Sequence, residues 1–320
     1  MGRILRRTRL RRAWLAPLLL FALAATTNAQ PVAPSSGTSV ETVNFESRLV
    51  GRRLPYKVVL PPCYDAGAST PPALYPTLYL LHGLTGHHTD WLSRTKLSGY
   101  AAQHRLIIVT PEGNDGWYTD SAGAASDKYE SYIIKELIPD VERRFRASRA
   151  REGRGVAGLS MGGYGALKFG LKYPELFAFA ASMSGAVGAA SWRTEEDLGR
   201  SEFIRRSLVQ TFGVGDTPTK RANDLFRLVR ELPEGRAPAL PFLYLDCGTE
   251  DPLRLLAPNA ALAALLVERK VAHEYRQLPG RHDWLYWDRQ VQEVLRLASD
   301  KLAAPAPAAR GASAGRIGSR

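Results

Sequence analysis

The chain has 320 residues, and 43 basic against 31 acidic side chains give it a net charge of +12. Hydrophobic residues make up 45% and charged residues 23%, proportions that are typical of a globular protein and exclude a mainly disordered or fibrous chain. Excess positive charge is also typical of nucleic-acid-binding proteins, so its distribution along the chain decides whether that class survives.

The beginning of the chain carries the pattern of an export signal. Residues 1–12 hold six arginines and no acid, residues 13–25 are largely apolar, and small residues lead up to Ala29. This order predicts a secretory signal peptide over residues 1–29 and an exported, periplasmic or secreted protein. The apolar run is shorter than the roughly 20 residues that span a bilayer, so we expect no stable membrane anchor after cleavage. An uncleaved anchor is the alternative.

The end of the chain, residues 303–320, is rich in Ala, Pro, Gly and Ser and lacks apolar periodicity, which predicts a disordered tail. It holds three arginines and no acid. The two ends therefore carry nine of the twelve positive charges, and residues 30–302 have a net charge of +3. We expect no nucleic-acid partner.

Residues 30–302 alternate between short apolar runs and segments with helical spacing. The alternation predicts a single α/β domain with a mostly parallel central sheet flanked by helices, entered through an antiparallel hairpin of its first two strands. The expected strands are residues 43–49, 56–60, 77–81, 106–110, 155–159, 179–184, 241–246 and 273–277. The expected helices are residues 129–145, 164–173, 202–211, 259–270 and 291–302.

Residues 191–239 interrupt this alternation. They are polar and rich in Arg and Glu, with one amphipathic helix. Such an insertion at the carboxyl edge of a sheet is either a cap over the site or a solvated connection without a role.

The chain has two cysteines, Cys63 and Cys247. Export permits a disulfide between them, but a bridge requires a short Cα separation that the sequence does not supply. Pairing stays open.

The sharpest motif is Gly158-Leu159-Ser160-Met161-Gly162. An expected strand precedes it and a helix follows, so Ser160 lies at a strand-to-helix elbow, where side chains at the two glycine positions would collide across the turn. A second Gly-x-Ser-x-Gly match around Ser313 lacks both neighbours. The context predicts Ser160 as a nucleophile.

A nucleophilic serine needs a base, which follows it in the chain of an α/β-hydrolase. Only His273 and His282 follow Ser160. His282 lies in a loop just beyond a strand, where it can reach the serine, whereas His273 begins that strand and is the structural alternative. The sequence therefore favours His282.

The acid that orients the base is expected just past the strand at residues 241–246. Asp251 is favoured, and Glu250 is the alternative. We expect Asp246 to cap the turn, and Asp283 is discounted because side chains adjacent in the chain rarely face each other.

The oxyanion hole needs two N–H groups. The amide of Met161 follows the nucleophile, and the amide of Leu84 lies in the loop Leu81–Gly86, where glycines let the backbone approach the site. His82 is expected to hold this loop.

His87 and His88, which Asp90 follows, suggest a metal site, but the sequence has no third ligand at a suitable spacing from the two histidines. We interpret them as a surface loop and expect neither a metal nor a cofactor.

Seven motifs resemble one known family. They are LHGLTG (81–86), PEGNDGWYTDS (111–121), ELIP (136–139), GLSMGGYGALK (158–168), SMSGAV (182–187), DCGTEDPL (246–253) and GRHDWLYWD (280–288). Together, from about residue 43 to 302, they resemble the esterase family of α/β-hydrolases. That group includes S-formylglutathione hydrolase (esterase D), tributyrin, feruloyl and acetyl-xylan esterases, siderophore trilactone esterases and mycobacterial mycolyltransferases.

The resemblance implies an α/β-hydrolase fold, a triad of Ser160, Asp251 and His282, and oxyanion donors at Leu84 and Met161. It also implies that Trp117 and Tyr118 lie near the acyl pocket; simple core aromatics are the alternative.

We therefore expect an exported serine carboxylic-ester hydrolase that works through an acyl-enzyme on short-chain, aryl or acyl-sugar esters. Its partner would be a small-molecule or saccharide ester, and S-formylglutathione is disfavoured because that substrate is cytosolic. An acyltransferase of the mycolyltransferase type and a non-catalytic binding protein on a hydrolase scaffold are the alternatives.

Overall fold

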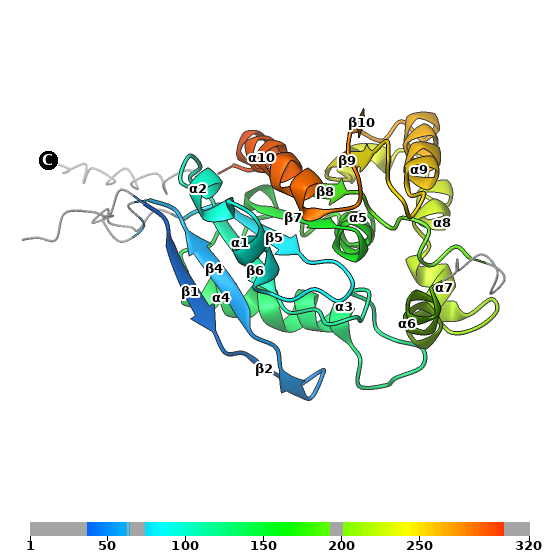
Figure 1. Cartoon of the computed structure of the whole chain (residues 1–320), viewed down its shortest axis with the longest axis horizontal. Coiled ribbons are helices and arrows are strands. Elements are labelled where there is room, and N and C mark those ends of the chain that lie inside the picture. Colours follow the sequence, from blue (N-terminus) through cyan, green and yellow to red (C-terminus); the bar gives the residue numbers. More distant parts are fainter. Residues whose placement is uncertain (1–36, 63, 65–73, 193–200, 304–320) are drawn as a thin grey trace, which may run out of the picture. The chain divides into compact units, whose positions relative to one another are not determined.

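The computed structural model describes residues 37–62, 64, 74–192 and 201–303 (Figure 1). The expected signal peptide, Cys63 and nearly all of the expected tail lie outside these residues. None of the described helices has the length and apolar character needed to cross a membrane.

The centre of the fold is an eight-stranded sheet with the order β1-β4-β6-β5-β7-β8-β9-β10. From β6 to β10 all neighbours are parallel, while β4 runs antiparallel to both β1 and β6. The strands are β1 (Ser39–Val43), β2 (Glu46–Ser47), β3 (Arg52–Arg53), β4 (Tyr56–Leu60), β5 (Thr77–Leu81), β6 (Ile107–Pro111), β7 (Arg154–Leu159), β8 (Phe179–Met183), β9 (Phe242–Gly248) and β10 (His273–Leu278).

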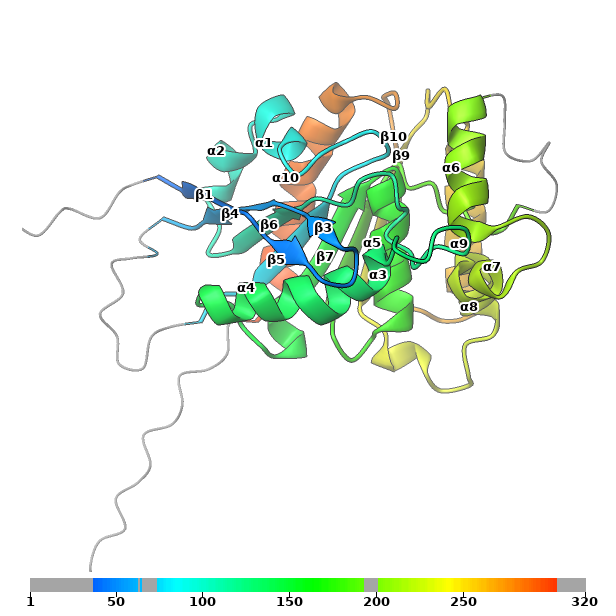
Figure 2. The same ribbon diagram turned by 90° about the horizontal axis from the view of Figure 1, so that it is seen from below.

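Helices cover both faces of the sheet (Figure 2). The described helices are α1 (Asp90–Arg94), α2 (Leu97–Ala101), α3 (Tyr129–Tyr132), the π-helical η1 (Ile133–Leu137), α4 (Ile138–Arg144), η2 (Arg151–Gly153), α5 (Met161–Lys172), α6 (Glu202–Phe212), α7 (Pro218–Asn223), α8 (Leu225–Arg230), η4 (Ala237–Ala239), α9 (Leu256–Glu268) and α10 (Trp284–Lys301). Helices α1, α2 and α10 pack on one face through one apolar cluster, and α3–α5, α8 and α9 pack on the other through a second. This is the expected α/β-hydrolase arrangement of helices around a mostly parallel sheet.

The first expected strand is wrong in its position. The strand that pairs antiparallel with β4 is β1, whose partners run from Ser39 with Leu60 to Val43 with Tyr56. Its side chains are mostly exposed, because an edge strand is held through main-chain hydrogen bonds and needs no apolar face. Residues 46–47 instead pair with residues 52–53 in a separate two-stranded sheet.

Helix α10 begins seven residues earlier than the periodicity predicts. Asp283 is its N-cap and accepts a hydrogen bond from the Tyr286 amide at 2.9 Å. The first turn contains Trp284 and Trp287, which pack toward α1 and the sheet. These tryptophans interrupt the apolar spacing of three and four residues by which a helix is recognised in the sequence. The helix therefore starts immediately beside His282.

Candidate active site

Ser160 lies in the turn between β7 and α5 with a positive φ of 51° and ψ of −114°. A Cβ at Gly158 would lie 2.5 Å from the backbone of Gly162, and a Cβ at Gly162 would lie 2.6 Å from the carbonyl oxygens of Leu81 and His82. Any side chain at either position would force the strand and the helix apart. The two glycines thus allow the elbow that presents Ser160.

The structure brings the three expected triad residues together. Nε2 of His282 lies 3.0 Å from Oγ of Ser160, and Nδ1 lies 2.8 Å from Oδ2 of Asp251. A carboxylate can only accept, so the Nδ1–H donates to Asp251 and Nε2 is left to accept from the serine hydroxyl. This arrangement can remove a proton from Ser160 and stabilise the resulting imidazolium.

The triad lies at the carboxyl ends of β7, β9 and β10, which are parallel and place their following loops at one edge of the sheet. Two main-chain hydrogen bonds join the loop of Asp251 to the loop of His282: Thr249 N–H donates to the Leu278 carbonyl and Glu250 N–H to the Gly280 carbonyl, both at 2.9 Å. The Asp251 side chain is buried, and its Oδ1 accepts from the Leu253 amide at 2.8 Å. The position of Asp251 is therefore fixed by the main-chain hydrogen bonds between the two loops and by the hydrogen bond from the Leu253 amide.

The alternatives considered for these roles lie elsewhere. His273 is at the start of β10, where Nδ1 lies 2.8 Å from the Val271 carbonyl oxygen. Glu250 is exposed. Asp283 is the N-cap of α10, so its carboxylate is engaged by the helix rather than by the histidine.

The expectation that Asp246 caps a turn is wrong. Asp246 belongs to β9 and is completely buried, and its Oδ1 accepts from the Tyr286 hydroxyl at 2.8 Å. Burial raises the pKa of Asp246 to about 7, although the hydrogen bond from the Tyr286 hydroxyl acts in the opposite direction. The sequence could not show that this side chain faces α10 inside the sheet.

The two expected oxyanion donors belong to segments next to the serine, and in the Leu84 loop a Cβ at Gly83 would lie 3.5 Å from Cβ of Ser160. Met161 is the first residue of α5, where amides have no partner within the helix. Leu84 lies in the loop after β5, and within the described residues its amide donates no hydrogen bond. Both N–H groups are therefore free to receive an oxyanion.

His82 ties the loop of Leu84 to the loop after β6. Its side chain is fully buried, and the Gly113 amide donates to Nε2 at 2.9 Å. The proton is then on Nδ1, which donates to the Gly83 carbonyl at 2.7 Å. The Tyr118 hydroxyl also donates to the His82 carbonyl at 3.0 Å. His82 thus holds the loop in place.

The region of His87 and His88 is organised around Glu112. Nδ1 of His88 lies 2.8 Å from Oε2 of Glu112, and Nδ1 of His87 lies 3.5 Å from Oε1. Burial alone would raise the pKa of Glu112, but hydrogen bonds from the ring and the amide of His88 hold that pKa well below its ordinary value. Within the described residues, no group of three or more His, Cys, Asp or Glu side chains is suited to a metal ion.

Trp117 and Tyr118 lie in a strained and firmly anchored loop. Their φ values are 51° and 49°, and Nζ of the buried Lys168 donates to the Tyr118 carbonyl. The ring of Tyr118 is completely buried and touches Gly113 and Gly165, so it supports the core beneath the Leu84 loop. Trp117 Nε1 donates to Ser207 Oγ of α6 at 3.1 Å, which connects this loop to the insertion.

Two further residues, Cys247 and Trp287, contact the triad without a signal in the sequence that marks them as site residues. Cys247 is a free, buried thiol with its Sγ 3.9 Å from Oδ2 of Asp251, and burial, followed by the charge of Asp251, raises its pKa to about 12. The ring of Trp287 packs edge-on against His282, with centroids 4.9 Å apart and planes at 85°. Both lie within the motifs around Asp251 and His282, but only the fold brings them into contact with the triad.

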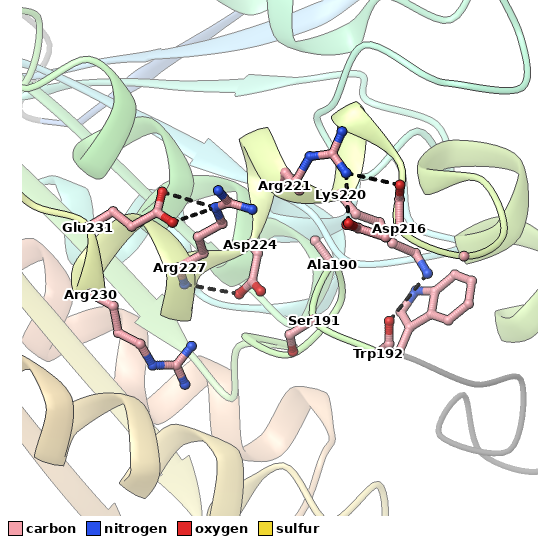
Figure 3. Close-up of a pocket in the computed structure, with 11 residues that line it drawn as sticks. Ala190, Ser191, Trp192, Asp216, Lys220, Arg221, Asp224, Arg227, Arg230 and Glu231 are labelled. Carbon is pink, nitrogen blue, oxygen red and sulfur yellow. Dashed lines mark hydrogen bonds and ion pairs between the residues drawn. The ribbon is translucent and has the colours of Figure 1, made fainter.

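A pocket of about 400 Å³ lies apart from the triad and the oxyanion loop (Figure 3). Its charged side chains largely satisfy one another: Arg221 pairs with Asp216 at 2.7 Å and Arg227 with Glu231 at 2.9 Å. The pocket is lined by Ala190, Ser191, Trp192, Gly215, Asp216, Lys220, Arg221, Asp224, Arg227, Arg230 and Glu231. Apart from Ala190, these residues belong to the insertion at residues 191–239.

Comparison with known proteins gives one consistent result. Residues 47–297 match the family model described as "Putative esterase". An acetyl esterase of Caldicellulosiruptor saccharolyticus is 25% identical over 261 residues, which cover 79% of this chain and 95% of that protein. A diacylglycerol acyltransferase/mycolyltransferase of Mycobacterium avium is also 25% identical, over 72% of this chain and 73% of its own length. A fluorophosphonate-binding serine hydrolase of Staphylococcus aureus, solved with substrate bound, superposes with a TM-score of 0.71 at 27% identity and covers 82% of this chain and 99% of its own.

Proposed function

The chain belongs to the esterase family of α/β-hydrolases and is a serine carboxylic-ester hydrolase, and on this premise we propose that Ser160, His282 and Asp251 carry the reaction. The observation that carries the proposal is the unbroken hydrogen-bond chain from Ser160 Oγ through His282 to Asp251, at 3.0 and 2.8 Å. A buried carboxylate, an oriented imidazole and a serine at a helix N-terminus are the parts that acyl transfer requires.

The reaction proceeds in two similar halves. His282 Nε2 takes the proton of Ser160 as Oγ attacks the ester carbonyl, and the amides of Leu84 and Met161 hold the oxyanion of the tetrahedral intermediate. The intermediate collapses, and the alcohol leaves with the proton from His282. Water then attacks the acyl-enzyme, again giving its proton to His282, and the carboxylic acid departs as the proton returns to Ser160. Asp251 stabilises the imidazolium in both halves.

Short-chain, aryl and acyl-sugar esters are the proposed substrates. The similarity to an acetyl esterase supports a small acyl group. A hydrolysis panel of acetyl and butyryl p-nitrophenyl esters, acetylated and feruloylated sugars and catecholate trilactones tests this proposal. The highest kcat/KM is expected among the p-nitrophenyl and sugar esters, and a preference for the trilactones would overturn the proposal.

Export is the second part of the proposal, and residues 1–29 support it by composition alone. Expression of the full chain in a bacterial host, followed by N-terminal sequencing of the protein outside the cytoplasm, is expected to give Gln30 as the first residue. Retention of the intact N-terminus in the cytoplasm would overturn this part and leave the chemistry untouched.

The test of the nucleophile uses the two Gly-x-Ser-x-Gly matches of the chain. Ser160→Ala is expected to lower kcat/KM for p-nitrophenyl acetate by about four to six orders of magnitude, because no other group can form the acyl-enzyme. Ser313→Ala changes the same residue type in the same local pattern outside the domain and is expected to keep wild-type activity. Near-native turnover by the Ser160 variant would contradict the assignment.

Acyl transfer to an alcohol other than water is the second candidate function, and the similarity to an acyltransferase/mycolyltransferase favours it. Both reactions share the acyl-enzyme and differ in which acceptor reaches it. Product analysis with p-nitrophenyl butyrate and added trehalose or glycerol separates them. Hydrolysis predicts free butyrate at all acceptor concentrations, whereas transfer predicts butyryl esters of the acceptor.

A further inference from the structure

A buried acid lies below the triad without a part in the proposed chemistry. Asp246 of β9 is completely buried, and its neighbours on that face of the sheet are Arg276, its cross-strand partner on β10, and the apolar and aromatic residues of the cluster under α10. A carboxyl group in such a place costs free energy unless hydrogen bonds compensate it. Within the described residues, Oδ2 of Asp246 has no hydrogen-bond partner, and Oδ1 has the Tyr286 hydroxyl at 2.8 Å. A buried group so poorly compensated calls for an explanation.

The partner of Asp246 belongs to the element that carries the base. Tyr286 lies in the first turn of α10, four residues after His282, and Asp246 lies five residues before Asp251. The hydrogen bond between them therefore joins β9, which leads into the loop of Asp251, to α10, which begins just after the loop of His282. We call the loop of residues 278–283 the histidine loop and the hydrogen bond from Tyr286 to Asp246 the latch.

The ring of Tyr286 also presses on the histidine loop. A Cβ at Gly280 would lie 2.3 Å from Cδ2 of Tyr286, and a Cβ at Gly248 would lie 2.3 Å from the Gly280 carbonyl oxygen. Gly280 is thus sandwiched between the end of β9 and the Tyr286 ring, and its φ of +152° is one that side chains rarely adopt. His282 is only two residues further along.

We propose that Asp246 and Tyr286 are positioning residues that act through the latch, which holds the ring of Tyr286 on Gly280 and so keeps His282 in register with Ser160 and Asp251. This inference rests on the triad proposed above. The latch touches no substrate, so its loss should lower kcat through a misplaced imidazole and leave substrate binding unchanged.

The test compares three variants by steady-state kinetics on p-nitrophenyl acetate and by thermal unfolding. Tyr286→Phe keeps the ring and removes the donor, and Asp246→Leu removes the acceptor with a side chain of similar size. Each is expected to lower kcat about ten-fold with KM within about two-fold of wild type. Tyr132→Phe is the matched control, because it removes a buried hydroxyl that has no partner within the described residues and is far along the chain from the site.

The double variant Tyr286→Phe/Asp246→Leu separates positioning from stability. Replacing both members of a buried polar pair by apolar groups is often neutral or stabilising, so its Tm should return to within a few degrees of wild type. The kcat of the double variant should nevertheless stay about ten-fold below wild type and no lower than that of either single variant. The reason is that the double variant and both single variants lack the same hydrogen bond.

Wild-type kcat in Tyr286→Phe, or full recovery of kcat together with Tm in the double variant, would overturn the latch. An increase of KM with unchanged kcat would also overturn it. These outcomes are distinct from failure of the triad, which would appear as hydrolysis by Ser160→Ala whatever the latch variants do.

Discussion

At Ser160 the backbone adopts a conformation that costs a non-glycine residue roughly 1–3 kcal/mol, with φ at 51°. The surrounding structure enforces it, because the close approach of Gly158 to Gly162 and of Gly162 to the end of β5 leaves the chain no room to relax. This strained backbone conformation directs Oγ of Ser160 toward His282 and places the Met161 amide at the start of α5. The close packing of Gly158, Gly162 and the end of β5 therefore causes both the strain at Ser160 and the orientation of its side chain.

Asp246 gives a pH-dependent prediction. Its pKa is 3.8 in an unfolded chain and about 7 in the folded protein, chiefly because of burial. Below pH 3.8 both states hold the proton, between these values only the unfolded chain ionises, and above pH 7 the folded protein must bury a charge. The free energy of unfolding should therefore contain a component that is lost as pH rises from 3.8 through about 7.

Urea unfolding of wild type and Asp246→Asn between pH 4.5 and 8 measures this component. Asparagine keeps an acceptor for Tyr286 and does not titrate, so the stability of the variant relative to wild type should rise across the range. Parallel curves for the two proteins would show that Asp246 does not titrate as its burial requires.

The sequence could predict that Ser160, Asp251 and His282 lie together, because the proposed chemistry demands a serine, an acid and a histidine at strand ends, in that order. The position of Asp246 could not be predicted, since a carboxylate at the end of an apolar run is typical of a turn. Only the register of β9 against β10, and the helix start at Trp284, reveal that it faces Tyr286.

At the scale of elements, α5 serves the site twice. Its first residue, Met161, carries one of the two proposed oxyanion amides. Two turns later Lys168 reaches the loop of Trp117 and Tyr118, where Nζ contacts the Tyr118 carbonyl, Thr119 Oγ1 and Glu130 Oε2. Burial lowers the pKa of Lys168 to about 8, and the charge of Glu130 counteracts this. Helix α5 thus fixes the loop of Trp117 and Tyr118 relative to the turn that holds Ser160.

Lys168→Met is expected to lower the free energy of unfolding by about 3 kcal/mol, because it leaves Glu130 buried with one cation fewer. Lys172 also contacts Glu130, but its side chain is 20% exposed, so Lys172→Met should cost less, about 1 kcal/mol. Urea unfolding at pH 7 measures both. Equal losses would mean that burial of Lys168 contributes nothing beyond an ordinary ion pair.

Elements with a continuous apolar character could be predicted closely, and β5 coincides with its expected range. Two signals failed. β1 is an exposed edge strand whose pairing leaves no pattern in the side chains, and the start of α10 is set by the Asp283 cap and by a cluster of tryptophans rather than by periodicity. The short helices α1, α2, α7 and α8 leave no recognisable pattern in the sequence, since one or two turns carry too little periodicity.

At the scale of the whole molecule, the net positive charge is concentrated at the two ends of the chain. The ends of the chain carry nine of the twelve positive charges, and the catalytic domain carries the rest. Binding of this protein to DNA should accordingly be negligible at physiological salt once residues 1–29 are removed. The insertion contacts the loop of Trp117 through Ser207. Because the family resemblance implies that Trp117 lies near the acyl pocket, we propose that changes in the insertion alter acyl selectivity first.

The most direct test of the account is to find which atom is acylated. A fluorophosphonate probe added to wild type, Ser313→Ala, His282→Ala and Ser160→Ala, followed by peptide mapping, reports the nucleophile and its dependence on the base. We predict one adduct per chain, on Ser160, in wild type and Ser313→Ala, slowed by several orders of magnitude in His282→Ala and absent in Ser160→Ala. An adduct on any other residue, or rapid labelling without His282, would contradict the triad.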